Sequence, residues 1–324
     1  MKMSSFQAFA LCSALIVTTG ANGQELQPVD EPIPPVATAA APAISSPAPA
    51  PPSAPPSQVA PQAAPIRTGW LNNPEADYQV SLHGELGLLW PVSHTIQFGK
   101  EGSRIDYVAQ GGQDNLFPLT RMSAEVELFK RHEIVLLYQP LQLVTTQTVR
   151  QELRVFDNRY AAGTPMRFSY GFDFWRLSYL YDFNDSPNTE IALGASLQIR
   201  NASIITEAVD GSQANYARNI GPVPVIKGRF RTDVGRWLWV GAEADGFYAP
   251  IRYLNGGSVD VVGSILDASI RSGLHLTPGV DTFLNLRYLG GGSSGTNSNT
   301  KEPGDGYTDN WLHFVSLTLG FTVR

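Results

Sequence analysis

The stretch EIALGASLQI, which runs from Glu190 to Ile199, carries apolar residues at every second position. Its apolar face consists of Ile191, Leu193, Ala195, Leu197 and Ile199. Successive side chains of a β-strand point to opposite faces, so the stretch predicts a strand with one apolar and one largely polar face. The stretch from Val315 to Val323 repeats this pattern near the carboxyl end. In a membrane we expect Leu197 to face lipid and Ser196 to face inward.

Stretches of this kind recur after Tyr78 and are separated by clusters of Gly, Asn, Asp, Ser and Pro. Strands are therefore predicted at residues 78–90, 118–129, 132–145, 168–183, 189–205, 222–232, 236–248, 259–274, 281–289 and 311–323. The pattern indicates an all-β chain. Specifically, it predicts a transmembrane antiparallel up-and-down β-barrel of about ten strands, with eight or twelve strands also open.

The connections between these strands alternate in length. Long connections are predicted after the odd-numbered strands and include residues 91–117, 146–167, 206–221 and 290–310. Short ones, such as Lys130-Arg131 and Asp233-Val234-Gly235, follow the even-numbered strands. A barrel with short periplasmic turns, long outer loops and both termini on the periplasmic side has this order.

A soluble β-sandwich also alternates, but with its apolar face inward. The order of the connections, an export signal and aromatic residues at the strand ends all favour the barrel. The aromatic residues expected to form girdles at the two membrane interfaces are Trp90, Tyr138, Trp175, Tyr179, Tyr181, Phe183, Trp237, Tyr248, Tyr288, Trp311 and Phe321.

The amino end of the chain has the features of an export signal. Lys2 precedes an apolar stretch from Phe6 to Val17, and Ala21-Asn22-Gly23 places small residues at the positions that a signal peptidase recognises. Residues 1–23 are therefore a predicted signal peptide, cleaved after Gly23. The only cysteine, Cys12, lies within it, so the mature chain is expected to have no disulfide, no thiolate nucleophile and no cysteine metal ligand.

Residues 24–77 are a predicted disordered periplasmic linker rich in proline and alanine. From Pro28 to Pro65 the chain is nearly all Pro, Ala, Ser, Val and Gln, which leaves no apolar face to bury. The density of proline favours an extended polyproline II backbone, long enough to contact the cell wall. Residues 78–324 then form the predicted transmembrane β-barrel.

The stretch FSYGFDFWRLSYLYDF, from Phe168 to Phe183, and the stretch from Gly194 to Ile204 resemble uncharacterised outer-membrane β-barrel proteins of Gram-negative bacteria. The resemblance covers the carboxyl-terminal two thirds of the chain and implies location in the cell outer membrane, with lipid and lipopolysaccharide as partners. The last strand is similar to the signal that such barrels present to the barrel-assembly machinery. That signal usually ends on an aromatic residue, whereas here Phe321 is followed by Thr322-Val323-Arg324.

If the apolar face of each strand meets lipid, the other face lines the lumen. The charged residues on that face are Glu85, Glu125, Glu127, Arg176, Arg200, Lys227, Arg229, Arg231, Glu243, Asp245, Asp267, Arg271 and Arg287. Acidic and basic residues come mostly from different strands, so they can pair across the lumen, and pairing offsets the cost of burying them. We therefore expect a plugged interior, as the narrow lumen of a ten-stranded barrel also indicates.

These observations predict an outer-membrane barrel with a structural, adhesive or narrow-conduit role through its lumen and outer loops. The alternative is a hydrolase at the outer rim, resembling lipid A deacylases or outer-membrane proteases, because Ser81 and His83 share one face of the first strand. These two residues are placed toward the periplasmic half, however, and His132 and His313 are expected at the interfaces. No catalytic residue is therefore assigned.

No metal site or cofactor is predicted either. Gly304-Asp305-Gly306 with Asp309 has oxygen ligands for calcium but is typical of a surface loop. The net charge of −6, without a basic tract, excludes nucleic acid as a partner.

Overall fold

The computed structural model describes residues 71, 76–250, 260–296 and 305–324. The predicted signal peptide and nearly all of the predicted linker lie outside the described residues. No helix in the described part is long and apolar enough to cross a membrane. The strands are β1 (Tyr78–Phe98), β2 (Ile105–Asp106), β3 (Phe117–Leu128), β4 (His132–Gln139), β5 (Gln142–Thr148), β6 (Leu153–Val155), β7 (Asn158–Tyr160), β8 (Pro165–Asp182), β9 (Thr189–Ala208), β10 (Ala214–Val234), β11 (Leu238–Pro250), β12 (Asp260–Thr277), β13 (Val280–Thr296) and β14 (Tyr307–Val323).

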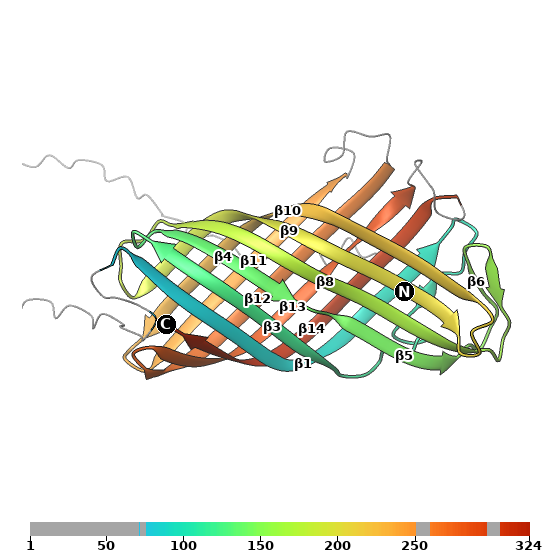
Figure 1. Ribbon diagram of the computed structural model, residues 1–324, viewed down its shortest axis with the longest axis horizontal. Helices are drawn as coiled ribbons and strands as arrows, with labels where there is room; N and C mark the ends of the chain where they lie inside the picture. The colour runs from blue at the N-terminus through green and yellow to red at the C-terminus, as the bar shows by residue number, and fades with distance from the viewer. Residues whose placement is uncertain (1–70, 72–75, 251–259, 297–304) are drawn as a thin grey trace, which may run out of the picture. The chain divides into compact units, whose positions relative to one another are not determined.

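Antiparallel pairing closes these strands into a barrel (Figure 1). The sheet follows the order β14-β13-β12-β11-β10-β9-β8-β4-β3-β1, and β14 pairs again with β1 from Leu82↔Val323 to Phe98↔Thr308. β5 follows β4 along the same side of β8, and β2 pairs with β1 over two residues only. The wall therefore has ten strand positions, and the predicted ten-stranded antiparallel barrel is confirmed.

Most strands are longer than their sequence pattern predicted, although β3 and β11 keep the predicted length and the predicted strand at 132–145 is divided into β4 and β5. β1 continues to Phe98, β8 begins at Pro165 and β13 runs to Thr296, so much of the predicted loops at 91–117, 146–167 and 290–310 is strand. The prediction of a long loop at 206–221 is wrong, because only residues 209–213 separate β9 from β10. Beyond the bilayer an outward face has no need to be apolar, so the alternation that marks a strand in the sequence fades there.

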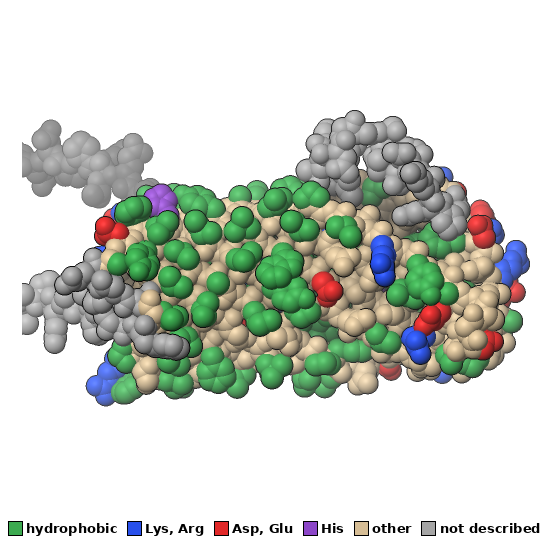
Figure 2. Space-filling view, in the orientation of Figure 1, with side chains coloured by type: hydrophobic (Ala, Val, Ile, Leu, Met, Phe, Trp, Pro, Cys, Tyr) green, Lys and Arg blue, Asp and Glu red, His purple; other side chains and the backbone are tan. Residues whose placement is uncertain are grey.

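The outward face of the barrel carries a band of exposed apolar side chains. Leu86, Leu197 and Leu317 are about half exposed or more, whereas Ser196 is only 6 % exposed and points into the lumen. The predicted orientations of Leu197 and Ser196 are confirmed. In Figure 2 hydrophobic side chains cover the wall toward the end that holds the carboxyl terminus, and the charged side chains gather toward the opposite end.

Aromatic side chains lie at both ends of this band. Trp311 and Phe321 are ten residues apart on β14, and Trp237 and Tyr248 are eleven apart at β11. With a rise of about 3.3 Å per residue and a strand tilt of about 45°, ten residues span roughly 25 Å, which is the height of the apolar band of outer-membrane barrels.

Three strands continue well beyond the aromatic residues at the end opposite the carboxyl terminus. β1 extends eight residues past Trp90, β8 begins ten residues before Trp175, and β13 extends eight residues past Tyr288. At the same tilt these extensions project about 20 Å beyond the apolar band. We call the end with the short turns and the carboxyl terminus the inner half, and the projecting end the outer half.

Candidate functional site

The lumen of the inner half is crossed by ion pairs, which we call the charged layer. Its members are Glu85, Arg121, Glu125, Glu133, Arg176, Lys227, Arg229, Glu243, Asp245, Asp267, Arg271 and Arg287. They come from β1, β3, β4, β8, β10, β11, β12 and β13, so nearly every strand contributes. Each of these strands turns its polar face inward because its other face meets lipid.

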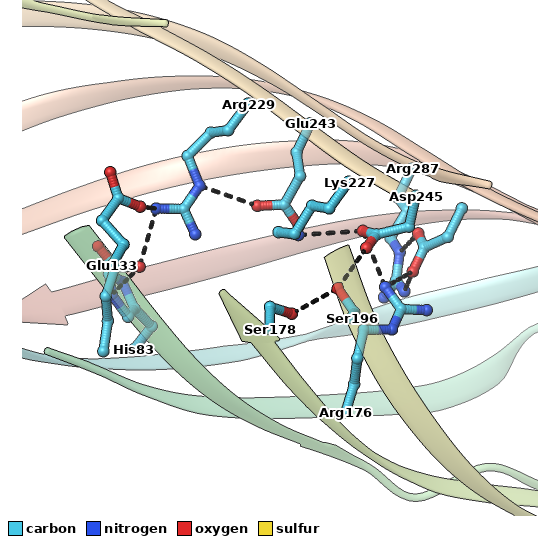
Figure 3. Close-up of polar contacts among 12 residues, drawn as sticks. His83, Glu133, Arg176, Ser178, Ser196, Lys227, Arg229, Glu243, Asp245 and Arg287 are labelled. Carbon is cyan, nitrogen blue, oxygen red and sulfur yellow. Dashed lines mark hydrogen bonds and ion pairs between the residues drawn. The ribbon is translucent and has the colours of Figure 1, made fainter. Parts of the chain in front are cut away.

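Arg176 lies at the centre of this layer and is 1 % exposed. Its Nη1 lies 2.8 Å from Asp245 Oδ2 (Figure 3) and 3.0 Å from Asp267 Oδ2. Its Nε and Nη2 donate to Gln198 Oε1. Arg287 pairs with the same Asp267 carboxylate and donates to Gln139 Oε1. A guanidinium buried with several partners of this kind is held in place and is costly to remove.

A second group of contacts lies nearer the inner end. Lys227 Nζ lies 2.6 Å from Glu243 Oε1 and 3.0 Å from Asp245 Oδ2. Arg229 Nη1 lies 2.6 Å from Glu133 Oε2 and 2.9 Å from Glu125 Oε2 (Figure 3). A cavity of about 70 Å³ lies among these side chains, room for about five water molecules.

The charged layer contains ten of the thirteen lumen charges predicted from the sequence. The other three lie apart: Glu127 is further along β3, Arg231 pairs with Asp281 at the inner end, and Arg200 faces the outer half. Sequence reasoning missed Arg121 and Glu133. Arg121 lies on the same strand face as Glu125, so the alternation with period two could have identified it. Glu133 could not be identified in this way, because Val135 and Leu137 make its strand face apolar in the sequence.

The outer half of the lumen has a different lining. Its inward side chains form an apolar cluster that includes Leu89, Tyr107, Phe168, Phe174 and Phe314, each at most 1 % exposed. Tyr107 and Thr206 are joined by a hydrogen bond of 2.9 Å between their hydroxyls. Of the lumen charges predicted from the sequence, only Arg200 faces this half.

The outer loops are held by their own polar contacts. The Asp305 carboxylate accepts the backbone N–H groups of Lys100 at 2.9 Å and Tyr307 at 3.0 Å, which ties the loop after β1 to the start of β14. These N–H groups hold the pKa of Asp305 below its ordinary value. Gly304 lies outside the described residues, and among the described ones no cluster of three His, Cys, Asp or Glu side chains has metal-ligand geometry.

The side chains considered for hydrolysis do not meet at the outer rim. Ser81 and His83 lie in the inner half, where His83 Nδ1 is 2.9 Å from Thr322 Oγ1 and His83 Nε2 is 4.0 Å from Glu125. His132 and His313 are hydrogen-bonded to the hydroxyls of Tyr179 and Tyr288.

The predicted girdle residues all lie on the outward side of the described barrel. Trp90, Trp175, Tyr179, Phe183, Trp237, Tyr248 and Phe321 are about half exposed or more, and Tyr138, Tyr181, Tyr288 and Trp311 are partly exposed. Tyr138 stacks on Trp175 with ring centroids 4.5 Å apart, so part of the outer ring is continuous across neighbouring strands.

No family model and no curated protein matches the chain. Solved structures with a similar chain course include the outer membrane protease OmpT from Escherichia coli, which is 11 % identical with a TM-score of 0.47 over 75 % of this chain and 96 % of that chain. Neisserial surface protein A is 12 % identical with a TM-score of 0.30 over 77 % of this chain and 99 % of that chain. Ail, the attachment invasion locus protein of Yersinia pestis, is 7 % identical with a TM-score of 0.31 over 75 % of this chain and 99 % of that chain. All three TM-scores are below 0.5, so the barrel assignment rests on the strand pairing and exposed apolar band of this chain itself.

Proposed function

We propose that the chain is a barrel of the outer membrane of a Gram-negative bacterium, closed to free diffusion, which acts through its outer half in a structural or adhesive role. The charged layer carries this proposal. Its side chains reach across the lumen from eight strands, and the cavity described among them measures about 70 Å³. A layer of paired charges that fills the lumen in this way blocks the passage of hydrated solutes and also fixes the cross-section of the barrel.

The outer half suits a surface role because it is a folded head with its own core. The β6–β7 hairpin and the loop after β1 pack into the apolar cluster through Leu153, Val155, Tyr160 and Tyr107. A head ordered by such a core presents a fixed surface beyond the membrane. The expected partners are outer-membrane lipid and lipopolysaccharide, the barrel-assembly machinery through β14, and the cell wall through the linker that precedes β1.

Electrical recording of the full chain in a planar lipid bilayer tests this function. The native chain is expected to give no discrete conductance steps, and Arg176→Ala combined with Arg287→Ala is expected to give them, since two large side chains leave the lumen. Stable steps from the native chain would replace the closed barrel with a narrow conduit. Folding of every sample is checked by the change in electrophoretic mobility on boiling, which a folded barrel shows.

A further inference from the structure

The wall of the barrel is interrupted between β10 and β11 in the outer half. β10 pairs with β9 from Ala214 to Thr232 but with β11 only from Ile226 to Val234. β11 continues past Gly246 to Pro250 and pairs there with β12 alone. Among the described residues, the β10 edge over residues 214–225 therefore has no strand beside it on the β11 side. We call this interruption the seam.

Three prolines explain why the described residues of β10 and β11 do not pair across the seam. Pro222 and Pro224 lie opposite Ile199 and Leu197 in a continuous ladder with β9, and proline has no N–H to donate. In an antiparallel ladder they must therefore occupy the positions whose backbone groups point away from β9, toward β11. Pro250 lies opposite Val262 in the ladder with β12, so its backbone groups likewise point away from β12, toward β10. Pro250 therefore has no N–H to donate to β10. Both edges of the seam thus lack donors that a closed ladder needs.

A cavity of about 370 Å³ lies at the seam. It is lined on one side by residues 218–223 of β10 and on the other by Phe247 of β11 and Val261, Gly263, Ser264 and Ile265 of β12. Phe98, Tyr170, Phe172, Ile204, Leu289 and Leu312 supply an apolar wall. The volume is within the range of small-molecule sites, roughly 300–1,000 Å³.

The polar groups of this cavity select an anion. Arg200 and Arg218 line it, and the described lining residues include no carboxylate. Arg200 Nη2 donates to Asn219 Oδ1 at 3.0 Å, but Arg200 Nε is buried without a hydrogen-bond partner among the described residues. Gln198 Nε2, a second donor that lines the cavity, is likewise buried without a partner among the described residues. A cation and unpaired polar atoms beside an apolar wall are complementary to a ligand with one anionic group and one apolar chain.

We propose that this cavity binds a single-chain amphiphile with an anionic head group, and that the ligand enters through the seam from the outer leaflet. The head group meets Arg200 and the chain lies along the apolar wall. Tyr248, which is 59 % exposed, lies on β11 just beyond its last pair with β10, so the seam opens at the level of the outer aromatic residues. The inference does not depend on whether the lumen conducts ions.

Binding is tested with dansyl-labelled undecanoic acid added to the full chain in phosphatidylcholine vesicles. Saturable binding is expected for the acid and is expected to weaken about tenfold or more in Arg200→Gln and for the uncharged methyl ester. Displacement by lysophosphatidic acid would identify a membrane lipid as the source of the ligand, and lack of displacement a free carboxylate amphiphile. Absence of saturable binding, or equal affinity for acid and ester, overturns the proposal.

A second test fills the cavity with a large side chain at Gly221. A Cβ built at Gly221 meets nothing within 4 Å, and the backbone of Gly221 is unstrained. Gly221→Trp is expected to abolish binding. Gly84→Trp is the matched control, since Gly84 has equally open space but lies on β1 on the lipid-facing side of the inner half. Unchanged binding in Gly221→Trp would show that the probe binds elsewhere. The mobility shift on boiling verifies that both variants fold.

Access through the seam is tested by closing it. Pro224→Cys with Tyr248→Cys places thiols on the two edges, and a reducible bifunctional thiol reagent joins them in a mature chain expected to have no other cysteine. Uptake of the dansyl acid from vesicles is expected to slow about tenfold or more and to recover on reduction. Phe230→Cys with Ala242→Cys, a register pair in the closed part of the same two strands, is expected to have no effect. Uptake that is unchanged by joining the seam would refute this route.

Discussion

The inner and outer halves of this barrel share the same ten-stranded wall but are filled by opposite chemistry. The inner half holds charged side chains that pair across the lumen, with Arg176 at the centre. The outer half holds buried aromatic and aliphatic side chains and a cavity at the seam. The inner half shows how a barrel surrounded by lipid, with its apolar side chains facing outward, fills its lumen with polar ones. The projecting half has a water-exposed exterior and can bury an apolar core as a soluble domain does.

The largest expected effect is on the charged layer. Arg176→Ala leaves Asp245 and Asp267 with one cation fewer in a buried site, which we expect to lower the free energy of unfolding by about 3–5 kcal/mol. Urea titration in lipid vesicles measures the loss. Arg167→Ala is the control in the outer half, because its 2.9 Å pair with Glu207 is partly exposed, and a loss of about 0.2–1 kcal/mol is expected. Equal losses would mean that the inner layer is hydrated rather than buried.

A second comparison locates the edge of the membrane. Leu197→Arg places a charge on the lipid-facing side of β9 and is expected to cost about 2–4 kcal/mol if the residue is near the midplane. Tyr216→Arg makes a comparable change on the outward side of β10 at the outer end, where Tyr216 is 60 % exposed, and an effect within about 0.5 kcal/mol is expected. A large loss at Tyr216 would extend the lipid-facing band over the projecting half.

A smaller effect is expected from the hydrogen bond inside the outer core. Tyr107→Phe removes the hydroxyl that contacts Thr206 and leaves one buried oxygen without that partner, at a cost of about 1 kcal/mol. Combining it with Thr206→Val removes both partners and is expected to recover part of the loss. A double variant that loses the sum of the two single losses would show that the hydroxyls do not interact in solution.

The smallest effect is expected from the linker. Deleting residues 28–65 removes a proline-rich segment without a buriable face, so the thermal stability of both halves of the barrel should be unchanged. Calorimetry of the full and shortened chains provides the comparison. A lower transition temperature after the deletion would indicate that this segment packs against the barrel.

The alternation of apolar and polar residues with a period of two was sufficient to predict which side chains of the inner half face lipid and which face the lumen. The lipid-facing side of β9 was identified by its apolar residues Ile191, Leu193 and Leu197. The orientation of one residue in a strand fixes that of its neighbours, so the charged residues on the opposite faces could be placed in the lumen. The outer half gave no such signal. From Gly290 to Gly295 the chain is glycine and serine, typical of a loop, yet it pairs with β12 and β14 as a strand, because backbone hydrogen bonds to two neighbours stabilise it without help from side chains.

By itself, the sequence determined a barrel, the lipid-facing side of its strands and most of the charges in its lumen, since a repeat with period two is a local property of the chain. It also determined that Pro222, Pro224 and Pro250 cannot donate to a ladder. Only the tertiary structure decided that these prolines lie on the two edges of the seam, that Arg176 meets Asp245 and Asp267, and that Arg200 belongs to the cavity rather than to the charged layer. Those relations depend on how distant strands are staggered when the sheet closes, and no short stretch of sequence encodes that stagger.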